Sequence, residues 1–281
     1  MQVGFIGAGN MAKAIINGLI SNNVVNKDDI IVNANTTETI TSVKEQFGVS
    51  TTLQKKEVLR YSDIVILAVK PNQMKSVIDS IKSEVKIIDT DIVFVSTAAG
   101  ITISELEGFF NDDNNIEASI DRDDNLLKIV RTMPNMPASV CEGMTGVSIN
   151  KNVKFSDIDK VLKVFGAIGK VEIVEEKLMD AVVAVSGSSP AYIYMIIDAM
   201  ARAVQSEGMK KDMATKFAAQ AVLGSAKMVL NSKKSAYELK EEVCCPGGTT
   251  IEAIKVLEDN NIDDIIIKAM DACMEKSKSL K

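Results

Sequence analysis

A glycine-rich segment close to the N-terminus, GFIGAGNMA, has the spacing of a G-x-G-x-x-A motif. Gly7 permits a tight turn, Gly9 leaves room for a pyrophosphate to approach the backbone, and Ala12 allows a helix to pack closely on a strand. A helix that begins near Asn10 and Met11 would offer unpaired N–H groups and the positive end of its dipole to the phosphates. The motif therefore predicts a dinucleotide site, and the alternative is a tight turn without a ligand.

The residues after the second expected strand bear on which dinucleotide binds. An NAD site usually has Asp or Glu there, to bind the ribose 2′-hydroxyl. Here Asn35 and Thr36 occupy that place, and no carboxylate appears before Glu38. Asn35 and Thr36 are able to donate hydrogen bonds to a 2′-phosphate, and Lys55 or Lys56 is able to supply a cation. We therefore expect NADPH, with NADH as the alternative; the two lysines are also compatible with a solvated helix start.

Two further loops follow apolar strand-like runs, at the edge of an open sheet where ligands bind. Lys70 in the first loop is suited to contact phosphate or ribose, and the small residues of the second let the backbone approach a ligand. Taken alone, each segment is as readily a plain loop. The candidate cofactor-binding residues in these loops are Ala68, Val69, Lys70, Pro71, Ala98, Ala99 and Gly100.

A second constellation, with the sequence CPGGTT, begins at Cys245 in the C-terminal half. Thr249 and Glu252 have the spacing of a capping box, which indicates the start of a helix. Alternatively, Gly247 and Gly248 leave backbone N–H groups open to a carboxylate, which would make this loop an anion site. The spacing alone does not decide between the two.

Composition excludes several classes of function. The chain of 281 residues has no histidine, which rules out His-based triads, His metal ligands and histidine pH switches. A formal net charge of −6 argues against a general nucleic-acid binder. We expect no metal site, reduced thiols and a cytoplasmic location, because no zinc or redox spacing relates the four cysteines, Cys141, Cys244, Cys245 and Cys273.

The hydropathy pattern predicts no membrane segment. The N-terminus runs directly into a strand pattern, without a positive region or a cleavage site. No run of 18 apolar residues exists, and the most apolar stretch, Ala191–Val204, is interrupted by Asp198 and Arg202. We expect that stretch to be a buried helix.

The first half of the chain alternates short apolar runs with helical patterns, whereas long helical patterns fill the second half. This alternation is typical of an open parallel sheet with helices on both faces. We expect an α/β chain: a Rossmann-like, mostly parallel sheet in residues 1–172 and an all-α domain in residues 173–281. The expected strands are Val3–Ile6, Ile30–Val32, Asp63–Val69, Asp91–Ser96 and Leu127–Val130; the expected helices are Met11–Ile20, Thr39–Phe47, Pro71–Ile81, Ser189–Glu207 with Ser189 as N-cap, Asp212–Asn231, Tyr237–Val243, Thr250–Leu257 and Ile262–Lys278. Asn111–Asn125, rich in Asn and Asp, is expected to be a surface loop.

These motifs, in this order, resemble the pyrroline-5-carboxylate reductase family over nearly the whole chain. The resemblance rests on the opening GFIGAGNMAKAI, then AVKP, STAAGITI, RTMPNMPA, VSGSSPAY and KFAAQAVLGSAKMV, and most specifically on CPGGTTIEAI. It implies reduction of the cyclic imine of 1-pyrroline-5-carboxylate to L-proline, the last step of proline biosynthesis, with NADPH or NADH. It also implies an intertwined homodimer formed by the C-terminal helices, with a decamer as a further assembly, and a substrate near the nicotinamide at the dimer interface.

The resemblance also assigns roles to residues. Thr249 corresponds to the threonine that hydrogen-bonds the ring nitrogen, and is the catalytic candidate. Asn135 is expected near the nicotinamide. The implied substrate-binding residues, which hold the carboxylate chiefly through backbone N–H groups, are Cys245, Gly247, Gly248, Thr249 and Thr250. Reduction of an imine needs a hydride and a proton but no histidine, so this chemistry fits the composition.

Three features depart from the family pattern, and two rival functions stay open. Cys245 replaces the usual serine, Lys55 replaces an asparagine, and the Asn/Asp-rich stretch is longer than usual. A β-hydroxyacid dehydrogenase would carry a catalytic lysine in its long interdomain helix, whereas Ser189–Glu207 has none. A non-catalytic NADPH sensor would have no need of a carboxylate site.

Overall fold

The computed structural model describes residues 1–88, 91–111 and 127–279. The chain forms two compact units. The first unit comprises Met1–Gly187 and Met274–Lys281, and the second comprises Ser188–Cys273. Residues 112–125 of the expected surface loop lie outside the described residues, and Asn111 ends a helix.

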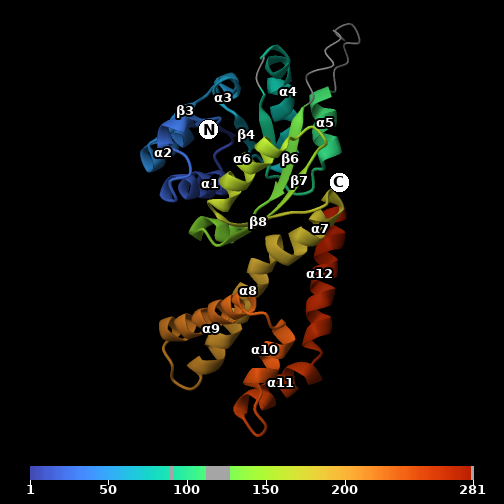
Figure 1. Cartoon of the computed structure of the whole chain (residues 1–281). Coiled ribbons are helices and arrows are strands. Elements are labelled where there is room, and N and C mark those ends of the chain that lie inside the picture. The colour runs from blue at the N-terminus through green and yellow to red at the C-terminus, as the bar shows by residue number, and fades with distance from the viewer. Residues whose placement is uncertain (89–90, 112–126, 280–281) are drawn as a thin grey trace. The chain divides into compact units, whose positions relative to one another are not determined.

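The first unit is built on an eight-stranded sheet in the order β3-β2-β1-β4-β5-β6-β7-β8 (Figure 1). The strands from β3 to β6 are parallel, β7 runs antiparallel to β6, and β8 runs parallel to β7. The mostly parallel sheet is therefore confirmed. The strands are β1 (Val3–Ile6), β2 (Ile30–Asn33), β3 (Ser50–Thr52), β4 (Ile64–Leu67), β5 (Val93–Ser96), β6 (Lys128–Met133), β7 (Gly143–Ile149) and β8 (Gly169–Ile173).

Helices cover both faces of this sheet, which explains why its central strands carry apolar residues on both faces. In β4, Ile64 and Ile66 pack into the core beside α1 and α6, whereas Val65 and Leu67 pack into the core beside α3, α4 and α5. The helices of the first unit are α1 (Asn10–Ser21), α2 (Thr37–Phe47), α3 (Lys55–Tyr61), α4 (Pro71–Ile87), α5 (Ile103–Asn111), α6 (Phe155–Gly166) and α7 (Met179–Val182), with short 3-10 turns at Lys27–Asp29, Met136–Val140 and Glu176–Leu178.

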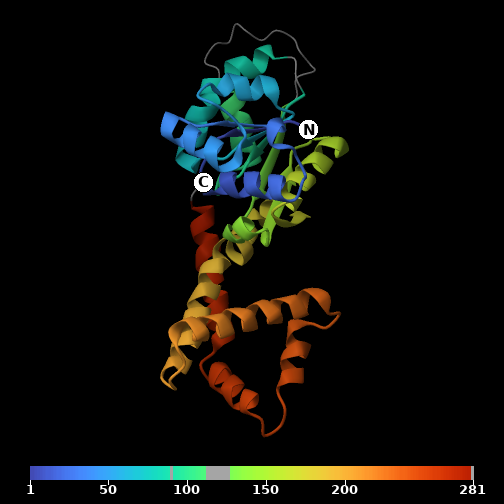
Figure 2. The same cartoon turned by 90° about the vertical axis from the view of Figure 1, so that its left-hand side faces the viewer.

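The second unit is entirely helical, as predicted. Its helices α8 and α9 cross and contact each other (Figures 1 and 2). Among the described residues of this unit, the only buried apolar side chains are Ala201, Ala214 and Ala218. The helices are α8 (Ser189–Gln205), α9 (Lys211–Asn231), α10 (Ala236–Val243), α11 (Thr249–Asp259) and α12 (Ile262–Lys278), whose last residues belong to the first unit.

The expectation that Ala191–Val204 is a buried helix is wrong for the single chain. Only Ala201 of this stretch is buried, and the side chains of Met195 and Tyr194 are 69% and 52% exposed. An apolar helix surface of this kind requires a partner outside the chain.

The predicted N-cap at Ser189 is also wrong, because Ser189 is the first residue of α8 and a continuous helical run precedes it. A π-helical segment, Val183–Ser188, joins α7 to α8. Pro190 has no N–H to donate to the carbonyl four residues earlier, which is that of Ser186. This oxygen accepts a hydrogen bond from Asn135 Nδ2 at 2.9 Å. The proline is therefore tolerated inside a continuous helical run.

Candidate active site

The carboxyl ends of β1, β2, β4, β5 and β6 meet at one edge of the sheet, because these strands are parallel neighbours. Backbone hydrogen bonds join the loops that follow them. Gly7 N donates to Asn33 O at 3.0 Å, and Ala68 N donates to Ile6 O at 2.9 Å. The predicted cofactor-binding loops of the first unit are thus brought together at this cofactor edge.

The two glycines of the N-terminal motif differ in what surrounds them. Gly7 has a φ of +103°, and a Cβ there would lie 2.4 Å from the Ala68 carbonyl oxygen. Only glycine fits that turn. Gly9 is exposed, and a Cβ there would meet no atom within 4 Å. The space above Gly9 is the room that a pyrophosphate needs to reach the backbone.

The start of α1 is open to an anion. Gly9 is its N-cap, no side chain caps it, and its first turn contains no acidic residue. Lys13 N is the first N–H to bond within the helix, to Gly9 O at 3.0 Å. The N–H groups of Asn10, Met11 and Ala12 therefore have no partner within the helix, and they stand at its positive end.

The structure distinguishes the two lysines near the end of β2. Lys56 Nζ lies 3.1 Å from Glu84 Oε2, and hydrogen bonds from Lys56 and Arg60 hold the pKa of Glu84 below its ordinary value. Among the described residues, Lys55 has no ion-pair partner. Lys55 begins α3, just beyond β3, which lies next to β2. Lys55 is therefore the lysine of the two that is available to a 2′-phosphate.

The other proposed contacts at the end of β2 are exposed. Asn35 and Thr36 lie on the surface, whereas Asn33 is buried and donates to Thr52 O at 3.1 Å. The Thr36 hydroxyl caps α2 by accepting from Thr39 N at 3.3 Å. Since an oxygen that accepts this bond still has a proton to donate, Thr36 stays a donor candidate.

The loops after β4 and β5 present different surfaces. Lys70 is exposed as the N-cap residue of α4, with Pro71 at the first helical position. Ala98 and Gly100 are buried, and Ala98 N donates to Ser96 Oγ at 3.3 Å. Lys70 and Pro71 are thus placed to touch a ligand. Ala98 and Gly100 instead form the floor of the loop, while Ala68, Val69 and Ala99 are half-buried.

Asn135 holds together the end of the sheet and the π-helical segment. Its side chain is buried, donates to Ser186 O at 2.9 Å and accepts from Met144 N at 2.9 Å. An amide group in this arrangement has one N–H and one lone pair remaining. Its hydrogen bonds make Asn135 a structural residue, and its place near the nicotinamide stays a prediction.

In the second unit, the CPGG sequence forms a type II β-turn. Gly248 N donates to Cys245 O at 2.9 Å, Pro246 occupies the second position and Gly247 the third, with a φ of +73°. This turn uses the N–H of Gly248, so the expectation that Gly248 leaves its N–H open to a carboxylate is revised. The turn directs the chain into α11, whose N-cap is Gly248.

The predicted capping box of Thr249 and Glu252 is wrong. No side chain caps α11, and Glu252 pairs instead with Lys255 at 2.7 Å. Among the described residues, the exposed Thr249 hydroxyl has no hydrogen-bond partner. The N–H groups in the first turn of α11, including those of Thr249 and Thr250, stand at the positive end of this 11-residue helix. The hydroxyl and these N–H groups are available to a substrate.

Sequence reasoning missed two polar clusters, because their members lie far apart along the chain. In the first unit, Glu176 bonds to Arg131 and Ile103. In the second, Cys273 Sγ donates to Ser188 Oγ at 3.2 Å. Burial and the Cys273 thiol raise the pKa of the neighbouring Tyr192. No local spacing signals either cluster.

The thiols and carboxylates form no metal cage in the described part of the chain. No group of three or more Cys, Asp or Glu side chains there is arranged to hold a metal ion, and all four cysteines are free thiols. Cys245 is exposed at the entrance to the turn. The two candidate sites offer uncapped helix starts with free N–H groups, and the second adds the Thr249 hydroxyl; groups of this kind suit an anion.

The fold and the phosphate-facing turn of the first unit define a dinucleotide-binding oxidoreductase of the Rossmann type. Two family models match the chain: "NADP oxidoreductase coenzyme F420-dependent" over residues 2–100, and "Pyrroline-5-carboxylate reductase dimerisation" over residues 176–280.

Full-length relatives narrow the class to one family. The chain is 43% identical to the pyrroline-5-carboxylate reductase of Escherichia coli strain K12, over 99% of this chain and 98% of the relative. It is 36% identical to that of Methanosarcina acetivorans, over 99% and 97%. The chain therefore belongs to the pyrroline-5-carboxylate reductase family.

Solved structures of the same family also match the chain over its full length. A pyrroline-5-carboxylate reductase from Coxiella burnetii matches with a TM-score of 0.88 and 35% identity, covering 100% of this chain and 98% of the other. The Plasmodium falciparum pyrroline carboxylate reductase with NADP bound matches with a TM-score of 0.84 and 28% identity, at the same coverage.

The dimerisation match bears on the most apolar helical run. Among the described residues, one helical run, Glu176–Gln205, is long and apolar enough to cross a membrane, and most of it is not buried inside the chain. Length and hydropathy do not distinguish a membrane span from a surface that another protein covers. Because the dimerisation model includes this run, a second copy of the chain accounts for its exposed side chains.

The predicted domain boundary at 172/173 stays a prediction, since the compact units divide after Gly187 and the family model begins at residue 176.

Proposed function

We propose that this chain is an NADPH-dependent pyrroline-5-carboxylate reductase, which reduces the C=N bond of 1-pyrroline-5-carboxylate to give L-proline in the last step of proline biosynthesis. The observation that carries the proposal is the 43% identity to a named reductase along 99% of the chain. NADH is the alternative cofactor. The absence of histidine fits, because an iminium substrate brings its own proton.

The residues at the cofactor edge fit a dinucleotide with a 2′-phosphate. The pyrophosphate lies over Gly9 against the N-terminus of α1, where a side chain would otherwise fill the space. Asn35, Thr36 and Lys55 contact the 2′-phosphate, and no carboxylate opposes it before Glu38. When bound, NADPH supplies the hydride. The full proposed set is Gly7, Gly9, Asn10, Met11, Asn35, Thr36, Lys55, Ala68, Val69, Lys70, Pro71, Ala98, Ala99, Gly100 and Asn135.

The start of α11 holds the substrate. Its first-turn N–H groups bind the carboxylate, which is stabilised by the positive end of the helix. The Thr249 hydroxyl hydrogen-bonds the ring nitrogen and thereby orients the C=N bond. The new C–H bond forms from the hydride, the π electrons pass to nitrogen, and nitrogen keeps the proton of the iminium. The proposed substrate-binding residues are Cys245, Gly247, Gly248, Thr249 and Thr250, with Gly248 acting through the shape of its turn.

The apolar surface of the second unit supports assembly. We infer a homodimer formed by the C-terminal helices, from which a decamer can be built, in the cytoplasm. Free thiols at all four cysteines are compatible with a reducing compartment. No role for nucleic acid or for a membrane is part of this proposal.

Loss of reduced-cofactor absorbance with DL-1-pyrroline-5-carboxylate tests the function on the purified protein. We expect oxidation that depends on substrate, and a higher kcat/KM with NADPH than with NADH. Folded protein that binds NADPH but oxidises neither cofactor would exclude the reductase and favour a sensor. A higher kcat/KM with NADH would exclude the proposed role of Lys55.

A further inference from the structure

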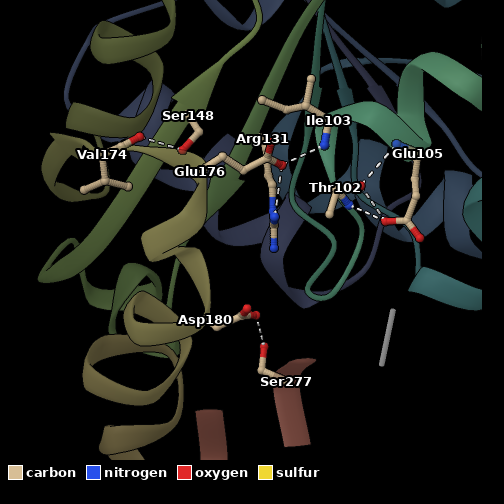
Figure 3. Close-up of polar contacts among 9 residues, drawn as sticks. All are labelled: Thr102, Ile103, Glu105, Arg131, Ser148, Val174, Glu176, Asp180 and Ser277. Carbon is tan, nitrogen blue, oxygen red and sulfur yellow. Dashed lines mark hydrogen bonds and ion pairs between the residues drawn. The ribbon is translucent and has the colours of Figure 1, made fainter. Parts of the chain in front are cut away.

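The segment that leaves β8 is fastened to the sheet by hydrogen bonds (Figure 3). Ser148 Oγ on β7 donates to Val174 O at 2.7 Å. Two residues further on, Glu176 Oε1 lies 3.0 Å from Arg131 Nη1 on β6 and accepts from Ile103 N, at the start of α5, at 2.7 Å. One carboxylate oxygen thus joins β6, α5 and the segment after β8. We call Glu176, Arg131 and Ile103 the Glu176 clamp.

Both partners of Glu176 need the bonds that it supplies. The Arg131 side chain is only 4% exposed, and a buried guanidinium requires a paired anion. Ile103 N belongs to the first turn of α5, where N–H groups lack partners within the helix. Thr102 and Glu105 satisfy neighbouring groups of the same turn, because Thr102 N donates to Glu105 Oε2 at 2.7 Å. The start of α5 is thus anchored both from inside the helix and by Glu176.

The elements that the clamp joins border one half of the cofactor site. The strand order reverses between β1 and β4, and a dinucleotide lies across that point. With the adenosine half over β1 and β2, the nicotinamide half extends over β4, β5 and β6. The loop at residues 97–100 leads from β5 into α5, and Arg131 precedes Asn135 by four residues on the other side. Thr132 Oγ1, next to Arg131, donates to Ser96 O at the end of β5 at 2.9 Å.

We infer that Glu176 is a positioning residue for hydride transfer: it fixes the β5–α5 loop and the end of β6 against each other, and so fixes the nicotinamide half of the cofactor without contacting it. This inference rests on the proposed function. The adenosine half lies beyond the reach of the clamp, so the two halves of the cofactor should respond differently to its loss.

The first test measures binding alone. Adenosine 2′,5′-bisphosphate carries only the adenosine half, whereas NADPH carries both. In Glu176→Gln we expect the Kd for NADPH to rise about fivefold to tenfold and that for the bisphosphate to stay within about twofold, as for loss of one charge-assisted hydrogen bond. The matched control is Glu175→Gln, because Glu175 is the adjacent residue, carries the same charge and is 70% exposed. Equal weakening of both ligands, or of neither, would overturn the inference.

The second test separates positioning from folding. In Glu176→Gln we expect kcat to fall about tenfold, as for loss of about 1.4 kcal/mol in the transition state, with the KM for the imine nearly unchanged. The isotope effect with NADPH deuterated at the transferred hydrogen should rise, because hydride transfer becomes slower. A fall in kcat that only tracks the fraction of unfolded protein, without a change in isotope effect, would overturn the inference.

If Glu176→Gln does not fold, Ser148→Ala is the second variant that tests the inference. It removes the bond to Val174 O and leaves Arg131 paired. We therefore expect the Kd for NADPH to rise and kcat to fall by about twofold to threefold, again with a larger isotope effect. Unchanged isotope effect and NADPH affinity in a folded Ser148→Ala protein would count against the clamp. A wild-type protein that binds NADPH but does not reduce the imine would exclude the proposed function, whereas the binding test would still decide the inference.

Discussion

The two units of this chain are stabilised in different ways. In the first, apolar residues lie on both faces of each central strand, and helices cover both faces. In the second, only three alanines are buried among the described apolar residues, while large side chains such as Phe217 and Met195 are more than 60% exposed. The first unit completes its core within one chain. The second unit has apolar residues in number, but the single chain leaves most of them on its surface, as at an interface between subunits.

This difference shows where function and assembly are encoded. The cofactor edge depends on a sheet that a single chain can fold, so its loops are held by hydrogen bonds within the first unit. The helical unit presents the turn and the helix N-terminus of the proposed substrate site, together with an exposed apolar surface. Substitutions should therefore affect stability in the first unit and association in the second.

The largest effect is expected from Lys128→Met in the first unit. Lys128 Nζ lies 2.8 Å from Asp157 and 2.6 Å from Asp91, and the side chains of Lys128 and Asp157 are 5% and 3% exposed. Burial favours the neutral amine, but hydrogen bonds to Asp157 and Asp91 outweigh it and raise the pKa of Lys128. Removing the cation leaves Asp157 buried without a counter-charge, which should cost about 3–5 kcal/mol in the free energy of unfolding.

Denaturant titration measures that loss. The control, Lys240→Met in the second unit, removes a cation from an exposed network with Glu241 and Glu258 and should change the free energy by less than about 1 kcal/mol. Equal losses in both variants would contradict the contrast between the two units.

Gly9→Val should abolish cofactor binding without unfolding the first unit. A Cβ at Gly9 meets no protein atom, so the fold tolerates the side chain while the pyrophosphate does not. We expect the Kd for NADPH to rise at least about 100-fold, or about 2.7 kcal/mol, with a melting temperature near that of the wild type. Fluorescence titration with NADPH and a thermal melt provide the two measurements. Normal affinity in this variant would disprove the role assigned to the turn.

Met195→Asp should act on association. Met195 is 69% exposed on α8, and two-fold symmetry would place the new charge in the interface twice. We expect the dimer Kd to rise about 100-fold, because a buried charge without a partner is costly. Mass measurement by light scattering over a concentration series detects the change. Phe155→Asp, at a residue 88% exposed in the first unit, should leave the mass unchanged. A stable dimer of the Met195 variant would place the interface elsewhere.

Thr249→Ala should lower kcat and spare the cofactor site. In the described residues the hydroxyl caps no helix, so its loss should not weaken α11. We expect kcat to fall about 10-fold to 100-fold, with the KM for NADPH within about twofold and with most activity retained in Thr249→Ser. Steady-state kinetics of both variants decide the point, and wild-type kcat in Thr249→Ala would remove Thr249 from the mechanism.

The smallest effect is expected from Asp91→Asn. A hydrogen bond from Lys128 holds the pKa of Asp91 below its ordinary value, although burial acts in the opposite sense. The stabilisation is therefore present above the unfolded pKa of about 3.9 and is lost as the pH falls through the lower folded value. Because the side chain is 72% exposed, we expect less than about 1 kcal/mol at pH 7. Unfolding titrations at neutral and acidic pH measure the difference, which should vanish at the acidic end.

Every strand and helix that the sequence predicted is present, but several further elements were missed. All five predicted strands are present, and the final helix has the predicted bounds, Ile262–Lys278. Three strands were missed, the internal strand β7 and the edge strands β3 and β8, together with the helices α3, α5 and α6. Of the two edge strands, β3 has three residues, and β8 has only partly buried and exposed positions. An edge strand gains its hydrogen bonds from a neighbour distant along the chain, so its own residues carry little signal.

The features of the candidate site also fall into those that the sequence predicted and those that it did not. The G-x-G-x-x-A motif was recognisable because its turn, its phosphate space and its helix start lie within a few residues. The same holds for the CPGG turn, although the use of the Gly248 N–H was not foreseen. The capping box predicted at Thr249 is absent, because the Glu252 carboxylate pairs with Lys255, one turn later.

The fold class, the two chemical motifs and the family were recognisable in the sequence, because these depend on residue types at short spacings. Tertiary structure alone decided that Lys56 is bound to Glu84 while Lys55 stays available, and that Asn135 also supports the π-helical segment. It alone brought Glu176 to Arg131 and Ile103, which lie 45 and 73 residues away. The physical reason is that a polar group bonds to whichever partner the fold brings near it, and sequence spacing does not record that choice.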